Sequence, residues 1–279
     1  MRLLFLFICL IPCILQAQTV CTAESRERLE SILEELSEMD IGDKSINELN
    51  VLIGQKFIGT PYVEKTLELP GDEQLVINLT GLDCTTYLET VFTLSRLAQK
   101  STLYMEAFEA ELENIRYVQG KRNGYPSRLH YFSDWLYQNE QKGLLKNISK
   151  EIGGESYENK PSFMSSNPNL YVQLSNPEYV AILKKAESEI AKREYFYLPK
   201  DTIQKLESSI KPGDLIAITT SMKTLDIVHV GFAVEKNGRI HLMHASTGSM
   251  EVEISEKPLH EYLQANKSQS GIMVARGNQ

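Results

Sequence analysis

The sequence predicts an α+β protein, and three observations support that prediction. Apolar residues recur at helical spacing in the stretches 26–39 and 129–141. From residue 211 onward the chain forms apolar, strand-like runs, and Asn237-Gly238 between two of them is the strongest short-range signal of a β-hairpin. A further strand-like run stops at Gly81, and a helix-like run begins at Cys84. Helices and strands therefore occupy largely separate parts of the chain.

Composition describes a globular chain that is long enough for one large domain or two small ones. The sequence has 279 residues, of which 42% are hydrophobic, and a formal net charge of -8. This acidic balance gives no general attraction to nucleic acid or to an anionic membrane, so an anionic substrate would need a few local Arg or Lys side chains. After the N-terminal segment no apolar run approaches the length that spans a bilayer, so we expect no stable membrane span.

The first residues have the layout of a secretory signal peptide. Arg2 precedes the apolar run Leu3 to Leu15, and cleavage is expected near Ala17, so we expect residues 1–17 to be removed and the protein to be periplasmic or secreted. Cys9 and Cys13 leave with that segment, which leaves Cys21 and Cys84 in the mature chain. Two cysteines form no disulfide framework, although a single bridge between them is open in an oxidising compartment.

Two helices and a hairpin are expected before Cys84. Arg26–Met39 carries an apolar stripe among acidic residues and forms part of an N-terminal extension over residues 18–44. Ser45-Ile46-Asn47-Glu48 is a capping box that opens a second helix running through Phe57. Residues 65–69 and 74–79 flank a Pro-Gly-Asp-Glu turn signal, so we expect a hairpin there that delivers the chain to Cys84.

Residues 101–210 are predicted to be mainly helical and loop-like. The spacing predicts helices over Thr102–Val118, Leu129–Gln141 and Pro177–Arg193, the last behind the cap Asn176. A basic and aromatic loop, Gly120 to Arg128, connects the first two helices. Such a loop is usually solvated, but Arg can also hold a carboxylate bidentately, which makes Arg128 a candidate substrate clamp.

Cys84 is the candidate nucleophile. Free backbone N–H groups and the macrodipole at the first turn of a helix favour an anion, so we expect the pKa of a thiol placed there to be lowered. A lone cysteine on a helix is more often a small buried hydrophobe. The interpretation therefore depends on partners elsewhere in the chain.

Two histidines are the candidate partners. Ile227 to Val234 and Arg239 to Ala245 flank Asn237-Gly238, and a two-residue loop there would place His229 and His244 on the same face as diagonal neighbours, roughly 7 to 8 Å apart. Such a pair of histidines is also typical of a metal site, or of surface residues without a function. No third and fourth ligand occurs at suitable spacing, which weakens the zinc alternative and leaves no metal site predicted.

Five ordered motifs resemble those of the NlpC/p60 superfamily of papain-like cell-wall cysteine hydrolases. They are Gly59-Thr60-Pro61-Tyr62, Leu82-Asp83-Cys84-Thr85-Thr86, Pro212-Gly213-Asp214-Leu215, His229-Val230-Gly231-Phe232 and His244-Ala245-Ser246. The Asp-Cys-Thr-Thr form and the long gap before the histidine are similar to a specialised branch described as N-acetylmuramoyl-L-alanine amidases. The resemblance implies an α+β papain-like core, in which an antiparallel sheet packs against the nucleophile helix. That amidase domain would span residues 45–279, with a helical insertion at about 101–210.

The resemblance also implies roles for individual residues. Cys84 would be the nucleophile, His229 its base and His244 the polar residue that orients His229. Tyr62 would lie beside the nucleophile and Asp83 would precede it, both at the substrate-binding side. Common members read Asp-Cys-Ser-Gly where this chain has Asp83-Cys84-Thr85-Thr86, which puts the usual specificity of the superfamily in doubt.

The function expected from these residues is an exported peptidoglycan hydrolase. It would cleave the amide bond between N-acetylmuramic acid and L-alanine through a cysteine thioester, acting on peptidoglycan or muropeptide fragments without a metal or organic cofactor. Three alternatives stay open. One is a γ-D-glutamyl-diaminopimelate endopeptidase of the same superfamily, another is a non-catalytic cell-wall binding module, and the third is acyl transfer to a lipid or amine.

Overall fold

The structure is a computed structural model, and it describes residues 19–278. The expected signal peptide, residues 1–17, lies outside the described residues. No helix within the described part of the chain is long and apolar enough to cross a membrane.

The main sheet has eight strands, and all of its named pairings are antiparallel. Its order is β4-β5-β10-β6-β7-β8-β9, with β3 pairing β10 beside this path. A separate two-stranded ribbon pairs β1 with β2 in parallel. The strands are β1 (Thr19–Cys21), β2 (Leu75–Ile77), β3 (Leu145–Asn147), β4 (Glu155–Ser156), β5 (Phe196–Pro199), β6 (Leu215–Thr220), β7 (Ile227–Lys236), β8 (Arg239–Ser246), β9 (Glu251–Ile254) and β10 (Gln269–Gly277).

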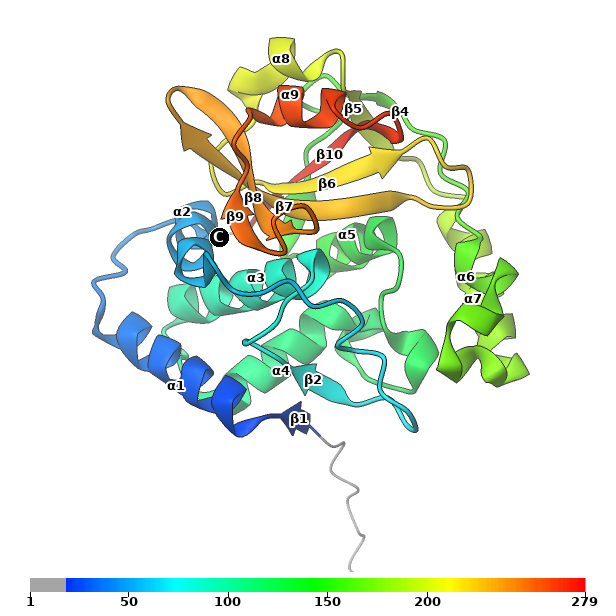
Figure 1. Cartoon of the computed structure of the whole chain (residues 1–279), viewed down its shortest axis with the longest axis horizontal. Helices are drawn as coiled ribbons and strands as arrows, with labels where there is room; N and C mark the ends of the chain where they lie inside the picture. Colours follow the sequence, from blue (N-terminus) through cyan, green and yellow to red (C-terminus); the bar gives the residue numbers. More distant parts are fainter. Residues whose placement is uncertain (1–18, 279) are drawn as a thin grey trace, which may run out of the picture.

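Helices cover both faces of this sheet (Figure 1). The α-helices are α1 (Ala23–Glu38), α2 (Ile46–Gly54), α3 (Cys84–Lys100), α4 (Met105–Arg116), α5 (Phe132–Gln141), α6 (Phe163–Ser166), α7 (Pro177–Ile190), α8 (Ile203–Leu206) and α9 (Leu259–Gln264). The 3-10 helices are η1 (Gln55–Phe57), η2 (Val118–Gly120), η3 (Tyr125–Ser127), η4 (Pro168–Leu170), η5 (Val172–Ser175) and η6 (Glu207–Ser209). The larger helices α2 to α5 lie on one side of the sheet, and the short helices α8 and α9 lie on the other (Figure 1).

Strand β6 shows why both faces are covered. Its six residues are all buried, although successive side chains of a strand point to opposite faces. Leu215 and Ala217 belong to the large core under the long helices, whereas Ile216 and Ile218 belong to a smaller core on the other face. The sheet is thus the middle layer of the molecule, with an apolar core on each side.

Helix α3 runs through the larger core and packs against β7 and β8. Its residues from Thr86 to Ala98 are all buried. The first turn of α3 therefore meets the middle of the antiparallel sheet, and this meeting point places Cys84 next to the strands that carry the two histidines.

Several helix and turn predictions are confirmed. The capping box at Ser45 is present, with reciprocal hydrogen bonds to Glu48. The Asn237-Gly238 turn joins β7 to β8 with both residues at positive φ, and Lys236 pairs with Arg239 as a two-residue loop requires. The helices expected over 102–118, 129–141 and 177–193 form with shorter bounds as α4, α5 and α7.

The predicted hairpin before Cys84 is wrong. Residues 64–67 form a turn, with Lys65 at φ 61, and residues 68–69 have no regular structure. Of the predicted hairpin, only Leu75–Ile77 is a strand. It pairs with β1 rather than with residues 65–69. The backbone carbonyl of Leu67 instead accepts a hydrogen bond from Arg128, so this segment is held by a side chain that is distant in sequence.

The papain-like NlpC/p60 core is not what the structure shows, although the α+β class is confirmed. Residues 101–210, expected to be a mainly helical insertion, also supply β3, β4 and β5. Two of these strands pair with β10, so this stretch completes the main sheet. Its strands are two to four residues long, too short for periodicity to reveal.

Candidate active site

Cys84 is the first residue of α3, as the sequence predicts. The cap residue Asp83 accepts a hydrogen bond from the backbone N–H of Thr86, and the Thr86 hydroxyl accepts one from the backbone N–H of Asp83. This reciprocal capping box explains the Asp-Cys-Thr-Thr pattern in local terms. It fixes the direction in which the chain enters the helix and therefore the position of the Cys84 side chain.

The pKa of the Cys84 thiol is raised to about 12, the opposite of the expected direction. Burial is the main cause, and the negative charge of Asp83 adds to it. A backbone hydrogen bond from Val230 and hydrogen bonds from Thr85 act in the lowering direction but are outweighed. The resting thiol is thus protonated near neutral pH, because desolvation outweighs the helix terminus. The bond from Val230 also shows that β7 reaches the thiol at the residue after His229.

The two histidines come together in the sheet. Nε2 of His229 lies 2.6 Å from Nδ1 of His244, and the rings are perpendicular with centroids 4.7 Å apart. The side chains are nearly inaccessible, with His229 8% and His244 0% exposed. Burial lowers the pKa of His229 to about 4 and that of His244 to about 3, so both rings are neutral near pH 7.

Gly231 makes the close approach of the two strands possible. A Cβ atom added there would lie 2.6 Å from the carbonyl oxygen of Met243 and 2.9 Å from Cβ of His244. Distances below 3.0 Å force a displacement, so any larger residue at this position would push β8 away from β7.

Two tyrosines flank the thiol. The pKa of Tyr62 is raised to about 12 by burial and by the nearby Cys84 and Asp83. Tyr262 on α9 has its pKa raised by burial and by the nearby Glu253 and Cys84. Its ring meets that of His244 edge to face, with centroids 5.4 Å apart.

A cavity of about 540 Å³ is lined by Asp83 and Thr85, the two sequence neighbours of Cys84, although Cys84 itself does not line it. Asp83, Thr85 and Glu89 line it along one side of α3, and Arg128 and His130 line it from the segment after η3. Leu170, Tyr171 and Val172 contribute an apolar rim, on which Leu170 is 58% and Val172 72% exposed. Its volume is within the range of small-molecule sites.

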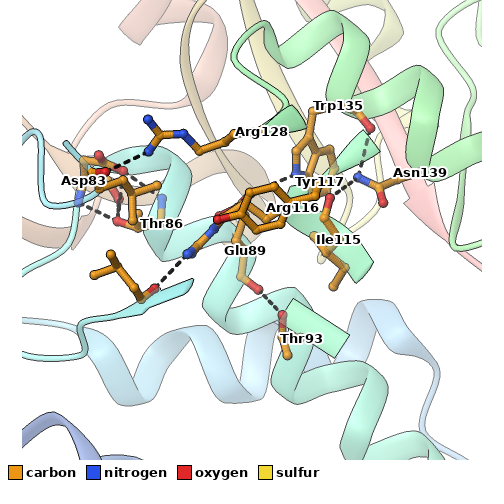
Figure 2. Close-up of polar contacts among 12 residues, drawn as sticks. Asp83, Thr86, Glu89, Thr93, Ile115, Arg116, Tyr117, Arg128, Trp135 and Asn139 are labelled. Carbon is orange, nitrogen blue, oxygen red and sulfur yellow. Dashed lines mark hydrogen bonds and ion pairs between the residues drawn. The ribbon is translucent and has the colours of Figure 1, made fainter. Parts of the chain in front are cut away.

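The floor of this cavity rests on a buried ion pair. Nε of Arg116 donates to Oε2 of Glu89 at 2.7 Å, and Nε1 of Trp135 donates to the other carboxylate oxygen of Glu89 at 3.1 Å (Figure 2). Arg116 also donates to the backbone carbonyl of Val76. These bonds connect α3, which carries Cys84, to α4 and α5, and they connect α4 to β2.

Arg128, the candidate substrate clamp, lines the cavity but already has partners. Its guanidinium donates to Glu68 at 2.6 Å and lies 3.5 Å from Glu73. The side chain is only 6% exposed and stacks over Tyr125. The charge is thus engaged by two carboxylates from the 65–73 turn region, and the clamp role stays a prediction.

Glu253 and Tyr262 are the residues of this region that sequence reasoning missed. Glu253 on β9 is the paired neighbour of His244 on β8. The alternation of polar and apolar residues in Glu251-Val252-Glu253-Ile254 could have predicted strand β9. It could not have predicted that Glu253 pairs with His244, because the loop between β8 and β9 has no strong turn motif that fixes the register. Tyr262 has no local signal, because only the fold brings α9 to the site. Within residues 19–278, no three His, Cys, Asp or Glu side chains gather as metal ligands.

Comparisons with known proteins identify the class. A crystal structure of an N-acetylmuramoyl-L-alanine amidase from Bacteroides uniformis is 38% identical, covers 84% of this chain and 99% of that chain, and gives a TM-score of 0.80. A Bacteroides fragilis structure named as a candidate xylanase is also 38% identical, with a TM-score of 0.75, and covers 81% of this chain and 99% of that one. A Legionella pneumophila structure, 24% identical, shares the fold with a TM-score of 0.69 and covers 93% of this chain and 97% of that chain.

The chain is therefore an amidase-like peptidoglycan hydrolase. It belongs to the N-acetylmuramoyl-L-alanine amidase-like family, whose family model matches residues 52–272. No curated protein matches the chain. The NlpC/p60 assignment made from the five short motifs is wrong, because the family model and the amidase structures identify a different fold family. A cysteine at a helix start and histidines on a hairpin are local features, which do not identify a family by themselves.

Proposed function

We propose that this family member is a cysteine-dependent N-acetylmuramoyl-L-alanine amidase with Cys84 as nucleophile, His229 as base and His244 as the residue that orients His229. The observation that carries the proposal is the 2.6 Å contact between Nε2 of His229 and Nδ1 of His244. This contact engages Nε2 of His229 and leaves Nδ1 as the ring nitrogen that would take the proton of Cys84, whose thiol accepts a hydrogen bond from Val230, the residue after His229.

The proposed reaction starts from neutral partners. Burial raises the pKa of Cys84 and lowers that of His229, so the thiol and the imidazole are both neutral before the reaction. The thiol proton therefore moves to His229 only as sulfur attacks the lactyl carbonyl of the muramoyl group. The carbonyl oxygen becomes an oxyanion, for which the backbone N–H of Cys84 at the helix start and the Tyr62 hydroxyl are candidate donors.

The remaining steps restore the enzyme. His229 gives its proton to the nitrogen of L-alanine, the carbon–nitrogen bond breaks and a thioester remains on Cys84. His229 then takes a proton from water, whose oxygen attacks the thioester, and the regained proton returns to sulfur as the muramic acid carboxyl group leaves. No step consumes a cofactor.

Hydrolysis of a glycosidic bond is less well supported. That reaction uses two carboxyl groups on opposite sides of the scissile bond. Of the three cavity carboxylates, Glu68 and Glu89 are already paired with Arg128 and Arg116, and Asp83 is engaged by Thr86 as the helix cap. No observation favours any two of them as an acid and base.

A defined disaccharide-tetrapeptide tests the proposal. Purified mature protein and its Cys84→Ala variant are incubated with this substrate side by side, and the products are weighed by mass spectrometry. We expect wild type alone to release free disaccharide and an intact peptide beginning with L-alanine. A dipeptide left on the sugar would instead establish the γ-D-glutamyl endopeptidase alternative. Product joined to a lipid or amine would establish acyl transfer, and binding without cleavage would favour the binding module.

We also propose that the protein is exported, on the basis of the signal-like residues 1–17. Mass analysis of protein isolated from its native host is expected to give a chain that begins just after Ala17. A chain that retains residues 1–17 would contradict export by signal cleavage.

A further inference from the structure

The outer nitrogen of His244 is a buried polar atom next to the proposed base. Its Nε2 is buried and has no hydrogen-bond partner among the described residues. Buried polar groups are nearly always paired, so an orphan of this kind requires an explanation. The carboxylate of Glu253 lies close by, with its Oε1 3.8 Å from Nε2.

The sheet register brings Glu253 to this position. His244 on β8 pairs directly with Glu253 on the edge strand β9, and directly opposed residues project from the same face of a sheet. The Glu253 side chain is 34% exposed, so it has freedom to rotate at the rim. A small rotation, or one bridging water, converts the 3.8 Å separation into a hydrogen-bonded contact.

Only two arrangements of protons suit the neutral His229–His244 pair. In the first, Nε2 of His229 donates to Nδ1 of His244, so Nδ1 of His229 has a free lone pair and Nε2 of His244 carries a proton. In the second, the bond runs the other way, so Nδ1 of His229 is protonated and Nε2 of His244 presents a lone pair. The first arrangement offers Glu253 a donor, whereas the second places a lone pair against its carboxylate.

We propose that Glu253 is a positioning residue that selects the first arrangement and so keeps Nδ1 of His229 free to accept the proton of Cys84. The inference rests on the proposed function for its catalytic consequence, although the tautomer itself is a property of the free protein. After proton transfer, the same carboxylate faces the positive charge shared by the two rings and stabilises it.

The surroundings of His244 strengthen its electrostatic interaction with Glu253. The ionisable side chains around His244 are His229 from β7, Glu253 from β9 and Tyr262 from α9. Cys84 in turn interacts electrostatically with Tyr262. The Tyr262 ring packs edge to face on His244 and limits water around it. A carboxylate interacts more strongly with a ring in such a poorly hydrated site than in open solvent.

Glu253→Gln is the informative substitution, because the amide serves as donor or acceptor and no longer prefers either tautomer. Glu251→Gln is the matched control. It makes the same change two residues away on β9, at an exposed position paired with Ser246. With the disaccharide-tetrapeptide as substrate, we expect Glu253→Gln to lower kcat at least about tenfold with little change in KM, as for other wrong-tautomer variants. Glu251→Gln should match wild type, and Glu253→Asp should recover part of the lost rate.

A second measurement, of the tautomers themselves, does not depend on enzymatic activity. Nitrogen chemical shifts of isotope-labelled histidines, assigned with His229→Gln and His244→Gln variants, report which ring nitrogen is protonated. We expect Nδ1 of His229 to be unprotonated in wild type and a mixture of tautomers in Glu253→Gln. A single unchanged tautomer in that variant, or a kcat equal to that of Glu251→Gln, would overturn the role of Glu253.

Different results would reject the cysteine mechanism and the positioning role of Glu253. If Cys84→Ala keeps full amidase activity, the cysteine mechanism is wrong whatever the tautomers show. If Cys84→Ala is inactive while Glu253→Gln retains both the wild-type rate and the wild-type tautomer, the mechanism stands and only the positioning role is rejected. Thermal unfolding of each variant shows whether a lost rate reflects a lost fold.

Discussion

The carboxylate of Glu89 and the guanidinium of Arg116 form a 2.7 Å ion pair directly beneath the cavity, with side chains only 2% and 3% exposed (Figure 2). Glu89 also accepts the indole N–H of Trp135. Neutralising the carboxylate would leave the Arg116 charge buried without its counter-charge, which is costly.

We therefore expect Glu89→Gln to lower the free energy of unfolding by about 3 kcal/mol. Glu27→Gln, the same change at an exposed position of α1, should stay within about 0.5 kcal/mol of wild type. Urea unfolding of both variants measures the difference. Equal stabilities would show that the buried pair contributes little beyond a neutral hydrogen bond.

Gly231→Ala tests the close approach of β7 and β8. The new Cβ would lie within 3.0 Å of Met243 and His244 atoms, so we expect a loss of about 1–3 kcal/mol in unfolding free energy and a fall in kcat as His244 moves. Gly248→Ala is the control, because its Cβ would meet nothing closer than 3.4 Å. A Gly231→Ala protein with wild-type kcat would mean that His244 tolerates displacement.

Arg128→Ala separates a structural role from the clamp. Removing the guanidinium leaves Glu68 and Glu73 facing each other without their shared partner, so we expect a marked loss of thermal stability and, through the altered turn region 65–73, weaker substrate binding. Arg128→Lys should restore stability only in part, because Lys lacks the planar fork that reaches two carboxylates. A raised KM at unchanged Tm would instead favour direct contact with substrate.

The thiol is expected to be slow toward alkylating reagents at neutral pH. With its pKa raised to about 12 by burial and Asp83, Cys84 should react with iodoacetamide more slowly than a free cysteine, and its rate should keep rising above pH 9. In protein produced without residues 1–17, a Cys21→Ser substitution leaves Cys84 as the one thiol. A reaction rate that levels off below pH 7 would reveal a preformed thiolate and imidazolium pair.

Stability should fall in mild acid. Burial lowers the pKa of His229 to about 4 and those of His130 and His244 to about 3, whereas unfolded histidines titrate near 6.5. Between these values the unfolded chain binds more protons than the folded one, so stability rises with pH from about 4 to about 6.5 and is then constant with respect to these groups. Tm measured across this range should show the slope, and the double variant His229→Gln/His244→Gln should weaken it. An unchanged slope would place the acid sensitivity elsewhere.

The sequence by itself determined the local features. The Ser45 capping box, the Asn237-Gly238 turn and the helix that starts at Cys84 each depend on a few neighbouring residues, so their patterns are readable without the fold. The turn also fixes the parity of the two strands, so the sequence alone predicts that His229 and His244 lie on the same face of the hairpin.

Tertiary structure decided everything that depends on distant residues. The pKa of Cys84 is governed by burial in a core built from many segments, so an argument from one helix terminus gave the wrong direction. The short strands β3 to β5, the turn held by Arg128 and the contact of Glu253 with His244 likewise depend on partners far along the chain or on registers without a turn signal. Short motifs encode local geometry, whereas desolvation and long-range pairing are properties of the packed molecule.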